Sequence, residues 1–140
     1  MPPHDRLEGS IDDLKRPLVR VQTPGYPDPL VAFIDTGFNG AIIIDAAQAA
    51  HLNFRVMPQE AEVLLASQRR ETFLLARGLF PWFGEEVLVT AYVLMETEAA
   101  RRARIARKTE EEILVGTELL TGCRVELDFP ARNVLITKVA

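Results

Sequence analysis

The chain has 140 residues, of which 48% are hydrophobic, 26% charged and 7% aromatic, and this is the composition of an ordinary soluble globular domain. The formal net charge of −4 argues against a general nucleic-acid-binding protein, because such proteins need a basic excess to neutralise phosphates. The charged N-terminus and the lack of an apolar run long enough to span a bilayer predict a soluble, cytoplasmic protein that contacts no membrane.

The first third of the chain is expected to contain an arm, three strands and a helix. Residues 1–16 are polar and aperiodic, which predicts a flexible N-terminal arm, and residues 17–140 are expected to form a single domain. Asp45 stands where a carboxylate can accept hydrogen bonds from the first amides of a helix over residues 46–52. Apolar and β-branched runs predict strands over residues 18–22, 30–34 and 41–44.

The rest of the chain has the pattern of further strands. Strand-like stretches over residues 62–66 and 72–77 enclose the polar Ser67-Gln68-Arg69-Arg70, which predicts a projecting hairpin. A strand is also expected over residues 87–94, whereas the charged segment 96–112 is neutral overall and has no predicted role. In the final hairpin, one sheet face is expected to carry the alternating apolar residues Val125, Leu127 and Phe129. Many short strands with one or two helices predict a mainly β barrel or sandwich.

The stretch Phe33-Ile34-Asp35-Thr36-Gly37 is the most informative in the sequence. An apolar strand runs into Asp-Thr-Gly and resumes at Ala41, which places one carboxylate on a tight loop between two buried strands. A carboxylate in apolar surroundings must be hydrogen-bonded or change its pKa, because an unpaired buried charge is costly. Asp and Gly are also ordinary turn formers, so a purely connecting turn is the simpler interpretation of the tripeptide alone.

A second feature lies near the other end of the chain, where an apolar strand runs into Gly116 and a short helical turn. Together with the earlier Asp-Thr-Gly, this order of motifs resembles the retropepsin-like aspartic proteases, and most closely the small bacterial clan AA aspartic proteases. The resemblance extends over residues 18–136 and includes the stretches FIDTGFNGAIII, PWFGEEV and LVGTELLTGCRVELDF. It implies the acid protease fold, a retropepsin-like closed β-barrel with one or two short helices.

The resemblance also implies a role for each matching residue. Asp35 would be the catalytic carboxylate, Thr36 would hydrogen-bond across the subunit contact beneath it, and Gly37 would hold the tight loop. The strand crossing behind this loop would be formed by Leu114, Val115 and Gly116. The flap over an extended peptide substrate would be the hairpin around Ser67, Gln68, Arg69 and Arg70. This flap tip has no glycine, whereas members of the family commonly have one.

Peptide hydrolysis of this kind needs two carboxylates, one to accept a proton from the attacking water and one to donate to the carbonyl oxygen. Asp35 is the only aspartate in an Asp-Thr-Gly motif. We therefore expect a homodimeric aspartic endopeptidase in which two copies of Asp35 meet, with no metal and no cofactor. Two alternatives stay open: a dimeric binding or regulatory module that hydrolyses nothing, and a monomeric β domain in which Asp35 is only a turn residue.

The remaining polar residues give weaker signals. His51 lies on the expected helix and His4 in the arm, and no third ligand has metal-like spacing, so solvent-facing histidines are the better interpretation. Cys123 is the only cysteine and cannot form an intrachain disulfide, and we expect it to pack as a small apolar residue.

Overall fold

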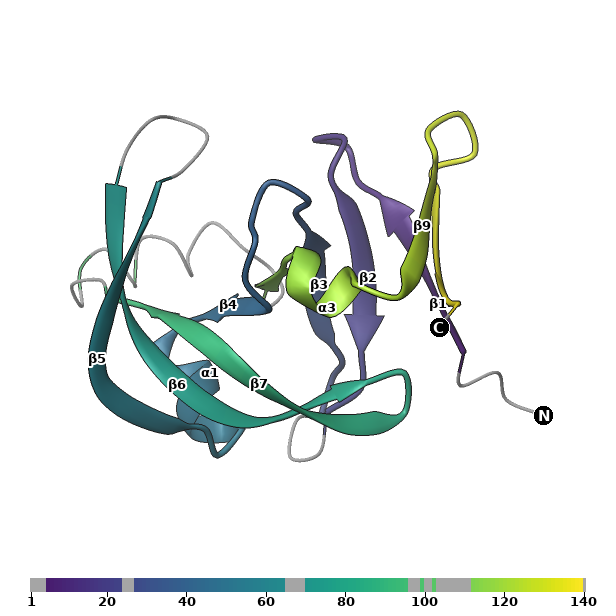
Figure 1. The fold of residues 1–140 in the computed structure, drawn as a ribbon. Coiled ribbons are helices and arrows are strands. Elements are labelled where there is room, and N and C mark those ends of the chain that lie inside the picture. Colours follow the sequence, from purple (N-terminus) through teal and green to yellow (C-terminus); the bar gives the residue numbers. More distant parts are fainter. Residues whose placement is uncertain are drawn as a thin grey trace.

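In the computed structural model of the chain, the described residues form one mixed sheet of ten strands (Figure 1). The structure describes residues 5–23, 27–64, 70–95 and 112–139, together with residues 99 and 102. The strands are β1 (Arg6–Ile11), β2 (Pro17–Val21), β3 (Leu30–Ile34), β4 (Ile42–Ile44), β5 (Arg55–Leu64), β6 (Arg70–Trp82), β7 (Glu85–Leu94), β8 (Glu112–Val115), β9 (Cys123–Asp128) and β10 (Asn133–Lys138). Two short helices of the described residues are α1 (Ala46–His51) and α3 (Thr117–Leu120).

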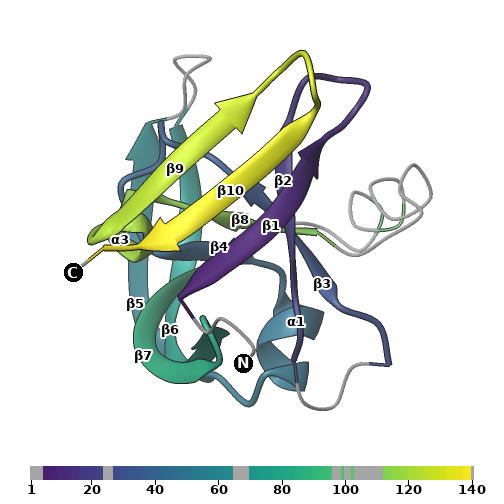
Figure 2. The same cartoon turned by 90° about the vertical axis from the view of Figure 1, so that its right-hand side faces the viewer.

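The strands follow the order β5-β6-β7-β4-β8-β3-β2-β1-β10-β9, so that β5 and β9 are the two edges. The molecule is mainly β, as expected, but the prediction of a closed β-barrel is wrong because the sheet is open. The sheet curves instead, with β5, β6 and β7 on one side and β1, β2, β9 and β10 on the other (Figures 1 and 2). An alternating sequence pattern indicates which face of a strand is covered. Closure of a sheet into a barrel depends instead on pairing between edge strands that are distant in the sequence.

The N-terminal segment differs from the expected flexible arm over residues 1–16, because residues 6–11 form β1 inside the sheet. Gly9 of β1 lies opposite both Val19 of β2 and Val134 of β10. Ile11 is buried in the core. A side chain at Gly9 would collide with the carbonyl oxygen of Leu18, so β1 lies close to β2 only because this position is glycine. The glycine also breaks the apolar alternation by which such a strand is usually predicted.

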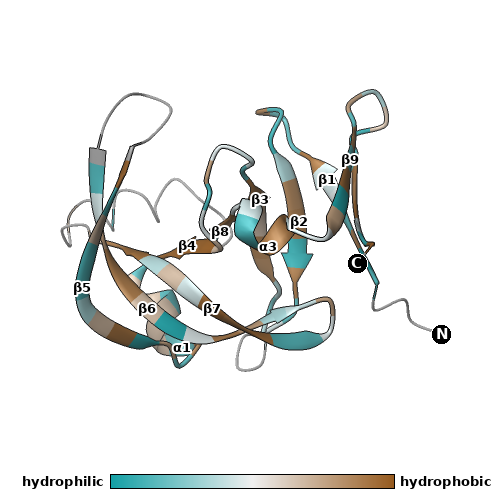
Figure 3. Ribbon diagram, viewed as in Figure 1, coloured by the Kyte–Doolittle hydropathy of each residue, from teal (hydrophilic) through white to brown (hydrophobic). Residues whose placement is uncertain are grey.

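The centre of the sheet is formed by β3, β4 and β8. Every residue of β3 except Phe33 is buried, as a continuous apolar run predicts for a strand covered on both faces. Figure 3 shows β4 and β8 coloured as hydrophobic along most of their length. Ile42 of β4 and Val115 of β8 are fully buried. The loop between β3 and β4 therefore starts and ends in the core.

The helix that was expected after Asp45 is confirmed as α1. The Asp45 carboxylate accepts a hydrogen bond from the Gln48 amide at 2.7 Å, and the Gln48 side chain accepts one from the Asp45 amide at 2.9 Å. This reciprocal arrangement is a capping box, and it satisfies two amides at the start of the helix. Asn53 has a φ of 58° and lies just beyond the helix, at the turn into β5.

The β6–β7 hairpin extends well beyond the strand expected over residues 72–77, since β6 has 13 residues. Its turn consists of Phe83 and Gly84, both with positive φ (55° and 75°), which matches the twist of a two-residue hairpin. Pro81 lies beyond Arg77, the last residue of β6 that pairs with β5. The missing N–H of this proline therefore interrupts no pairing with β5.

The final hairpin is confirmed as β9 and β10, but the apolar face of β9 is covered only in part. Val125 is half-buried, whereas Leu127 is 42% exposed and Phe129, just after the strand, is 50% exposed. β9 is an edge strand of the described sheet, where β10 is its one neighbour. Among the described residues, no helix combines the length and the apolar character that a membrane crossing requires.

Candidate functional site

Asp35 directly follows β3 and begins a tight loop, residues 35–41, which we call the Asp35 loop. The backbone N–H of Asp35 donates to the carbonyl oxygen of Val115 at 2.9 Å. The carboxylate Oδ1 of Asp35 accepts a hydrogen bond from the Gly37 amide at 2.9 Å. Asp35 is half-buried, and both Thr36 and Gly37 are exposed. The carboxylate is thus held by its own loop and still reaches solvent.

β8 lies between the two strands that the Asp35 loop connects. It runs parallel to β3, where Val115 is opposite Ile34, and antiparallel to β4, where Val115 is opposite Ile42. The Asp35 loop therefore joins strands that lie on either side of β8. Leu114 and Val115, which the family resemblance assigns to a strand behind the loop, are the last two residues of β8, and Gly116 follows them.

Gly116 lies where the chain passes closest to the Asp35 loop. Its amide donates to the carbonyl oxygen of Ala41 at 2.9 Å. A side chain at this position would collide with the carbonyl oxygens of Gly40 and Phe38 and with the Phe38 ring. Glycine is therefore required here by close backbone packing.

The start of α3 binds the same loop. The Thr117 amide donates to the Phe38 carbonyl oxygen at 2.8 Å, and the Glu118 amide donates to the Gly40 carbonyl oxygen at 3.2 Å. The first amides of a helix have no partner inside the helix, so they are free to make such bonds. The backbone of the Asp35 loop is consequently bonded to the end of β8 and to the start of α3.

Aromatic side chains attach the loop to the β6–β7 part of the sheet. Phe38, in the middle of the loop, is 6% exposed, and its ring meets Tyr92 of β7 edge-on at a centroid distance of 5.3 Å. Tyr92 in turn meets Phe73 of β6 edge-on at 5.9 Å. Such edge-to-face pairs are favourable beyond the burial of their area. They connect the backbone around Asp35 with the part of the β5–β6 hairpin where Phe73 lies opposite Ala61.

The predicted flap falls mostly outside the described residues. Ser67, Gln68 and Arg69 are not described, whereas Arg70 is the first residue of β6 and pairs with Leu64 of β5. The paired ends of β5 and β6 and the Asp35 loop lie on the same side of the molecule, at the top of Figure 1. The segment 96–112 is likewise undescribed, apart from residues 99, 102 and 112.

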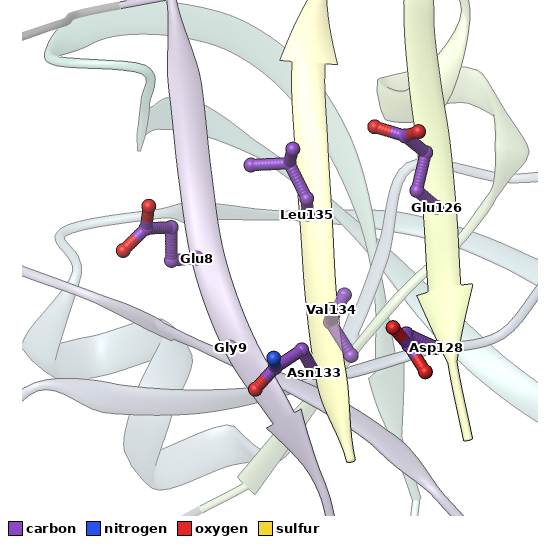
Figure 4. Close-up of a pocket in the computed structure, with 7 residues that line it drawn as sticks. All are labelled: Glu8, Gly9, Glu126, Asp128, Asn133, Val134 and Leu135. Carbon is purple, nitrogen blue, oxygen red and sulfur yellow. The ribbon is translucent and has the colours of Figure 1, made fainter. Parts of the chain in front are cut away.

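One hollow on the described residues lies away from Asp35. It has a volume of about 440 Å³ and lies over β1, β10 and β9, where Glu8, Glu126 and Asp128 line it (Figure 4). The strands present these carboxylates on an outward-facing surface, and Glu8 is paired with Arg6 at 3.3 Å. The chemistry suggested by the sequence therefore does not coincide with this hollow.

The other candidate metal-binding or reactive side chains in the described ranges do not come together in one site. No set of three or more His, Cys, Asp or Glu side chains there is arranged to hold a metal ion. His51 is exposed in the last turn of α1, and His4 lies outside the described residues. Cys123 is half-buried and packs against the core. Burial raises the pKa of its thiol, although the charge of Lys138 opposes this in part.

Two groups of residues around the site were not predicted. Phe38 and Tyr92 hold the Asp35 loop in place. The signal for this contact in the sequence is weak, because it consists of one aromatic residue within an otherwise polar, glycine-rich turn. An ion pair between Arg16 and Glu112 lies at the far end of β8. These two residues are 96 positions apart, so no local pattern could indicate their contact.

Comparison of the chain with protein-family models, with curated proteins and with solved structures found no match. The observations that bear on function are therefore the geometry around Asp35 and the resemblance of its motifs to those of aspartic proteases.

Proposed function

We propose that this chain is an aspartic endopeptidase in which the Asp35 carboxylates of two copies share one proton and activate water for attack on a peptide bond. The observation that carries the proposal is the setting of Asp35. Asp35 is a half-buried residue at the end of a buried strand, on a loop whose backbone is bonded to β8 and to α3. A reacting group needs such fixation, because misplacement by about 1 Å can cost about a hundredfold in rate.

In this mechanism the two carboxylates have different roles. One is ionised and accepts a proton from the attacking water, and the other is protonated and donates to the carbonyl oxygen of the substrate. Two carboxylates about 3 Å apart cannot both ionise, so they titrate as a coupled pair. The rate should therefore depend on pH with a bell-shaped profile and an acidic to near-neutral optimum. A rate that rises steadily up to about pH 9 would contradict the shared proton.

The arrangement of loops supports a homodimer. The Asp35 loop, the β1–β2 turn and the β9–β10 turn all lie at the top of the molecule as drawn in Figure 1. The two turns expose apolar side chains at this end: Leu14 is 75% exposed and Phe129 is 50% exposed. Two copies that met here about a two-fold axis would bring the Asp35 loops together and cover both side chains. Each subunit would supply half of the catalytic pair.

An extended peptide is the substrate that suits this arrangement. The paired ends of β5 and β6 lie at the same end as the Asp35 loop (Figure 1). A peptide bound as a strand can be held largely through its backbone, which gives affinity without a strict sequence requirement. We therefore expect cleavage within proteins or long peptides.

The proposal is tested with a mixed peptide library from pH 4 to 8, using the wild type, Asp35→Asn and Asp28→Asn. The Asp35→Asn side chain can still accept the Gly37 hydrogen bond but cannot exchange the proton, so this variant should fold, dimerise and cleave nothing. Asp28→Asn changes an exposed aspartate and should cleave like the wild type. Cleavage that persists in Asp35→Asn would refute the mechanism.

Two other outcomes would favour the alternatives. A wild-type dimer that cleaves nothing across this pH range would favour a binding or regulatory module. A wild type that sediments as a monomer would favour a β domain in which Asp35 only forms a turn, a role that its hydrogen bond from Gly37 already allows.

A further inference from the structure

The start of β8 is held by an ion pair that no local pattern in the sequence predicts. The Arg16 guanidinium meets the Glu112 carboxylate through Nη1 and Oε1 at 3.0 Å and through Nη2 and Oε2 at 3.3 Å. The side chains of Arg16 and Glu112 are only 29% and 15% exposed. Two parallel hydrogen bonds of this kind fix the relative orientation of both groups, and water screens them less than a surface pair.

Arg16 is itself fixed before it reaches Glu112. Its Nε donates to Asp12 Oδ2 at 2.8 Å, and its charged carbon lies 5.5 Å from the centre of the Phe33 ring. Asp12 Oδ1 also accepts hydrogen bonds from the amides of Leu14 and Arg16 at 3.0 and 2.9 Å. The β1–β2 turn thus presents the guanidinium to β8 in one defined orientation.

The main chain of Glu112 is held as well, by a residue of α1. Gln48 Nε2 donates to the Glu112 carbonyl oxygen at 3.1 Å. Gln48 is 2% exposed and is fixed in the capping box with Asp45. The first residue of β8 is therefore tied to the β1–β2 turn through its side chain and to α1 through its main chain.

β8 itself is short, with four residues, and only two of them pair with β4. Displacement of a strand by one residue reverses the face to which every side chain points. The other end of this strand carries the Val115 carbonyl that accepts the Asp35 amide, and next to it the Gly116 amide that binds Ala41. The position of β8 along its neighbours therefore sets the position of the Asp35 loop.

We infer that the Arg16–Glu112 pair is a positioning device, which fixes β8 along β3 and β4 and thereby holds the Asp35 carboxylate where it reacts. The inference that this matters for catalysis rests on the proposed function, whereas the effect on the Asp35 loop does not. Arg16 acts through β8 and is a positioning residue. Its loss should disturb the catalytic step more than substrate binding.

The test uses Arg16→Gln, Arg16→Lys and, as the control, Lys138→Gln, which removes an exposed ion pair with Glu85 of 3.4 Å. Hydrogen exchange is followed at the amides of Asp35 and Gly116 and, for reference, at Val134 and Ile136 in β10. Arg16→Gln should speed exchange selectively at Asp35 and Gly116. Arg16→Lys keeps the positive charge but cannot form the two parallel hydrogen bonds, so it should speed exchange less than Arg16→Gln does.

The second readout is peptide cleavage. Arg16→Gln should lower kcat by about ten- to a hundredfold and leave KM within about twofold, because the reacting group is displaced while the binding surface remains. Arg16→Lys should restore part of kcat, and Lys138→Gln should match the wild type. If Arg16→Gln does not fold, Glu112→Gln removes the same ion pair with a smaller change of shape and is interpreted in the same way.

The outcomes separate this inference from the proposed function. Exchange that rises equally across the sheet, or that does not exceed the Lys138→Gln control, would show that the pair has no specific effect on the Asp35 loop and would overturn the inference. An unchanged kcat together with a lower melting temperature would also overturn it. If the wild type cleaves nothing, the proposed function fails, and selective exchange at Asp35 and Gly116 still decides whether the pair positions the loop.

Discussion

The amide of Asp35 and the carbonyl oxygen of Val115 are joined by a hydrogen bond of 2.9 Å, which links the end of β3 to the end of β8. The two strands are parallel neighbours, so their carboxyl ends lie at the same edge. The Asp35 loop and α3 both begin at this edge, and each contributes to the backbone bonds that hold the other. The carboxylate at the centre of our proposal is therefore positioned by main-chain contacts between residues 35–41 and residues 115–118, which are far apart in the sequence.

Gly116→Ala should destabilise the fold. The added methyl group would collide with backbone oxygens of Gly40 and Phe38, which cannot move aside as the end of a flexible side chain could. Overpacking of this kind costs about 1–3 kcal/mol of the free energy of unfolding, which urea denaturation measures as a lower midpoint. A midpoint equal to that of the wild type would show that the loop and β8 are not in close contact.

Gly37→Ala should instead affect activity more than stability. A methyl group at Gly37 would lie 3.2 Å from Asp35 Oδ1, so the carboxylate would have to shift by a few tenths of an ångström. Because Gly37 is exposed, the fold should tolerate the change. We expect kcat for peptide cleavage to fall by about tenfold with little change in the urea midpoint. An unchanged kcat would argue that the Asp35 carboxylate takes no part in the reaction.

Charged substitutions at the end of the molecule that carries the Asp35 loop should weaken dimerisation. Leu14→Asp and Phe129→Asp place like charges at exposed apolar positions that the proposed dimer would cover. The dissociation constant, from sedimentation equilibrium, should rise by at least about tenfold, since like charges brought together across an interface cost several kcal/mol.

Leu88→Asp is the matched control for these variants. Leu88 is 59% exposed and lies on β7, near the β6–β7 turn, away from the end that carries the Asp35 loop (Figure 1). Its dissociation constant should equal that of the wild type. If Leu88→Asp weakened the dimer and the other two variants did not, the contact surface would be wrongly placed.

Stability at low pH should depend on Asp12. Burial raises the pKa of Asp12, but hydrogen bonds from the amide and guanidinium of Arg16 outweigh burial, so the pKa lies below its usual value of 3.8. A carboxylate with a lowered pKa stabilises the folded state above the unfolded pKa, and this contribution is lost as the pH falls through the folded value. The free energy of unfolding should therefore fall as the pH is lowered from about 4.

Asp12→Asn should flatten this part of the stability curve, as measured by urea denaturation at a series of pH values. Asp13→Asn is the control, because the ion pair of Asp13 with Arg132 has an almost fully exposed carboxylate and surface pairs contribute little. A curve for Asp12→Asn as steep as that of the wild type would show that other groups cause the loss of stability in acid.

Local signals in the sequence predicted individual elements. Asp45 followed by Gln48 is enough to start α1, and the apolar run of residues 30–34 is enough to place β3 in the core. The contacts that start α1 lie within a few residues of one another in the sequence. The place of β3 in the core depends only on the burial of its apolar side chains. The loop around Asp35 could likewise be placed, because its charge and glycine interrupt apolar strands.

The long-range features could not be predicted in the same way. An edge strand and a paired strand can have the same alternation, so an open sheet was mistaken for a closed barrel. β1 was mistaken for an arm because Gly9 interrupts its pattern. The Arg16–Glu112 pair joins charged residues that each look like ordinary surface residues in their own segments. Such contacts are decided by which strands become neighbours in space.

The distance between the two Asp35 carboxylates in a crystal of the native assembly tests the central claim most directly. We expect a two-fold dimer in which oxygen atoms of the two carboxylates lie about 3 Å apart, close enough to share a proton. A native monomer, or a dimer whose Asp35 side chains are too far apart for a hydrogen bond, would contradict the proposed hydrolase.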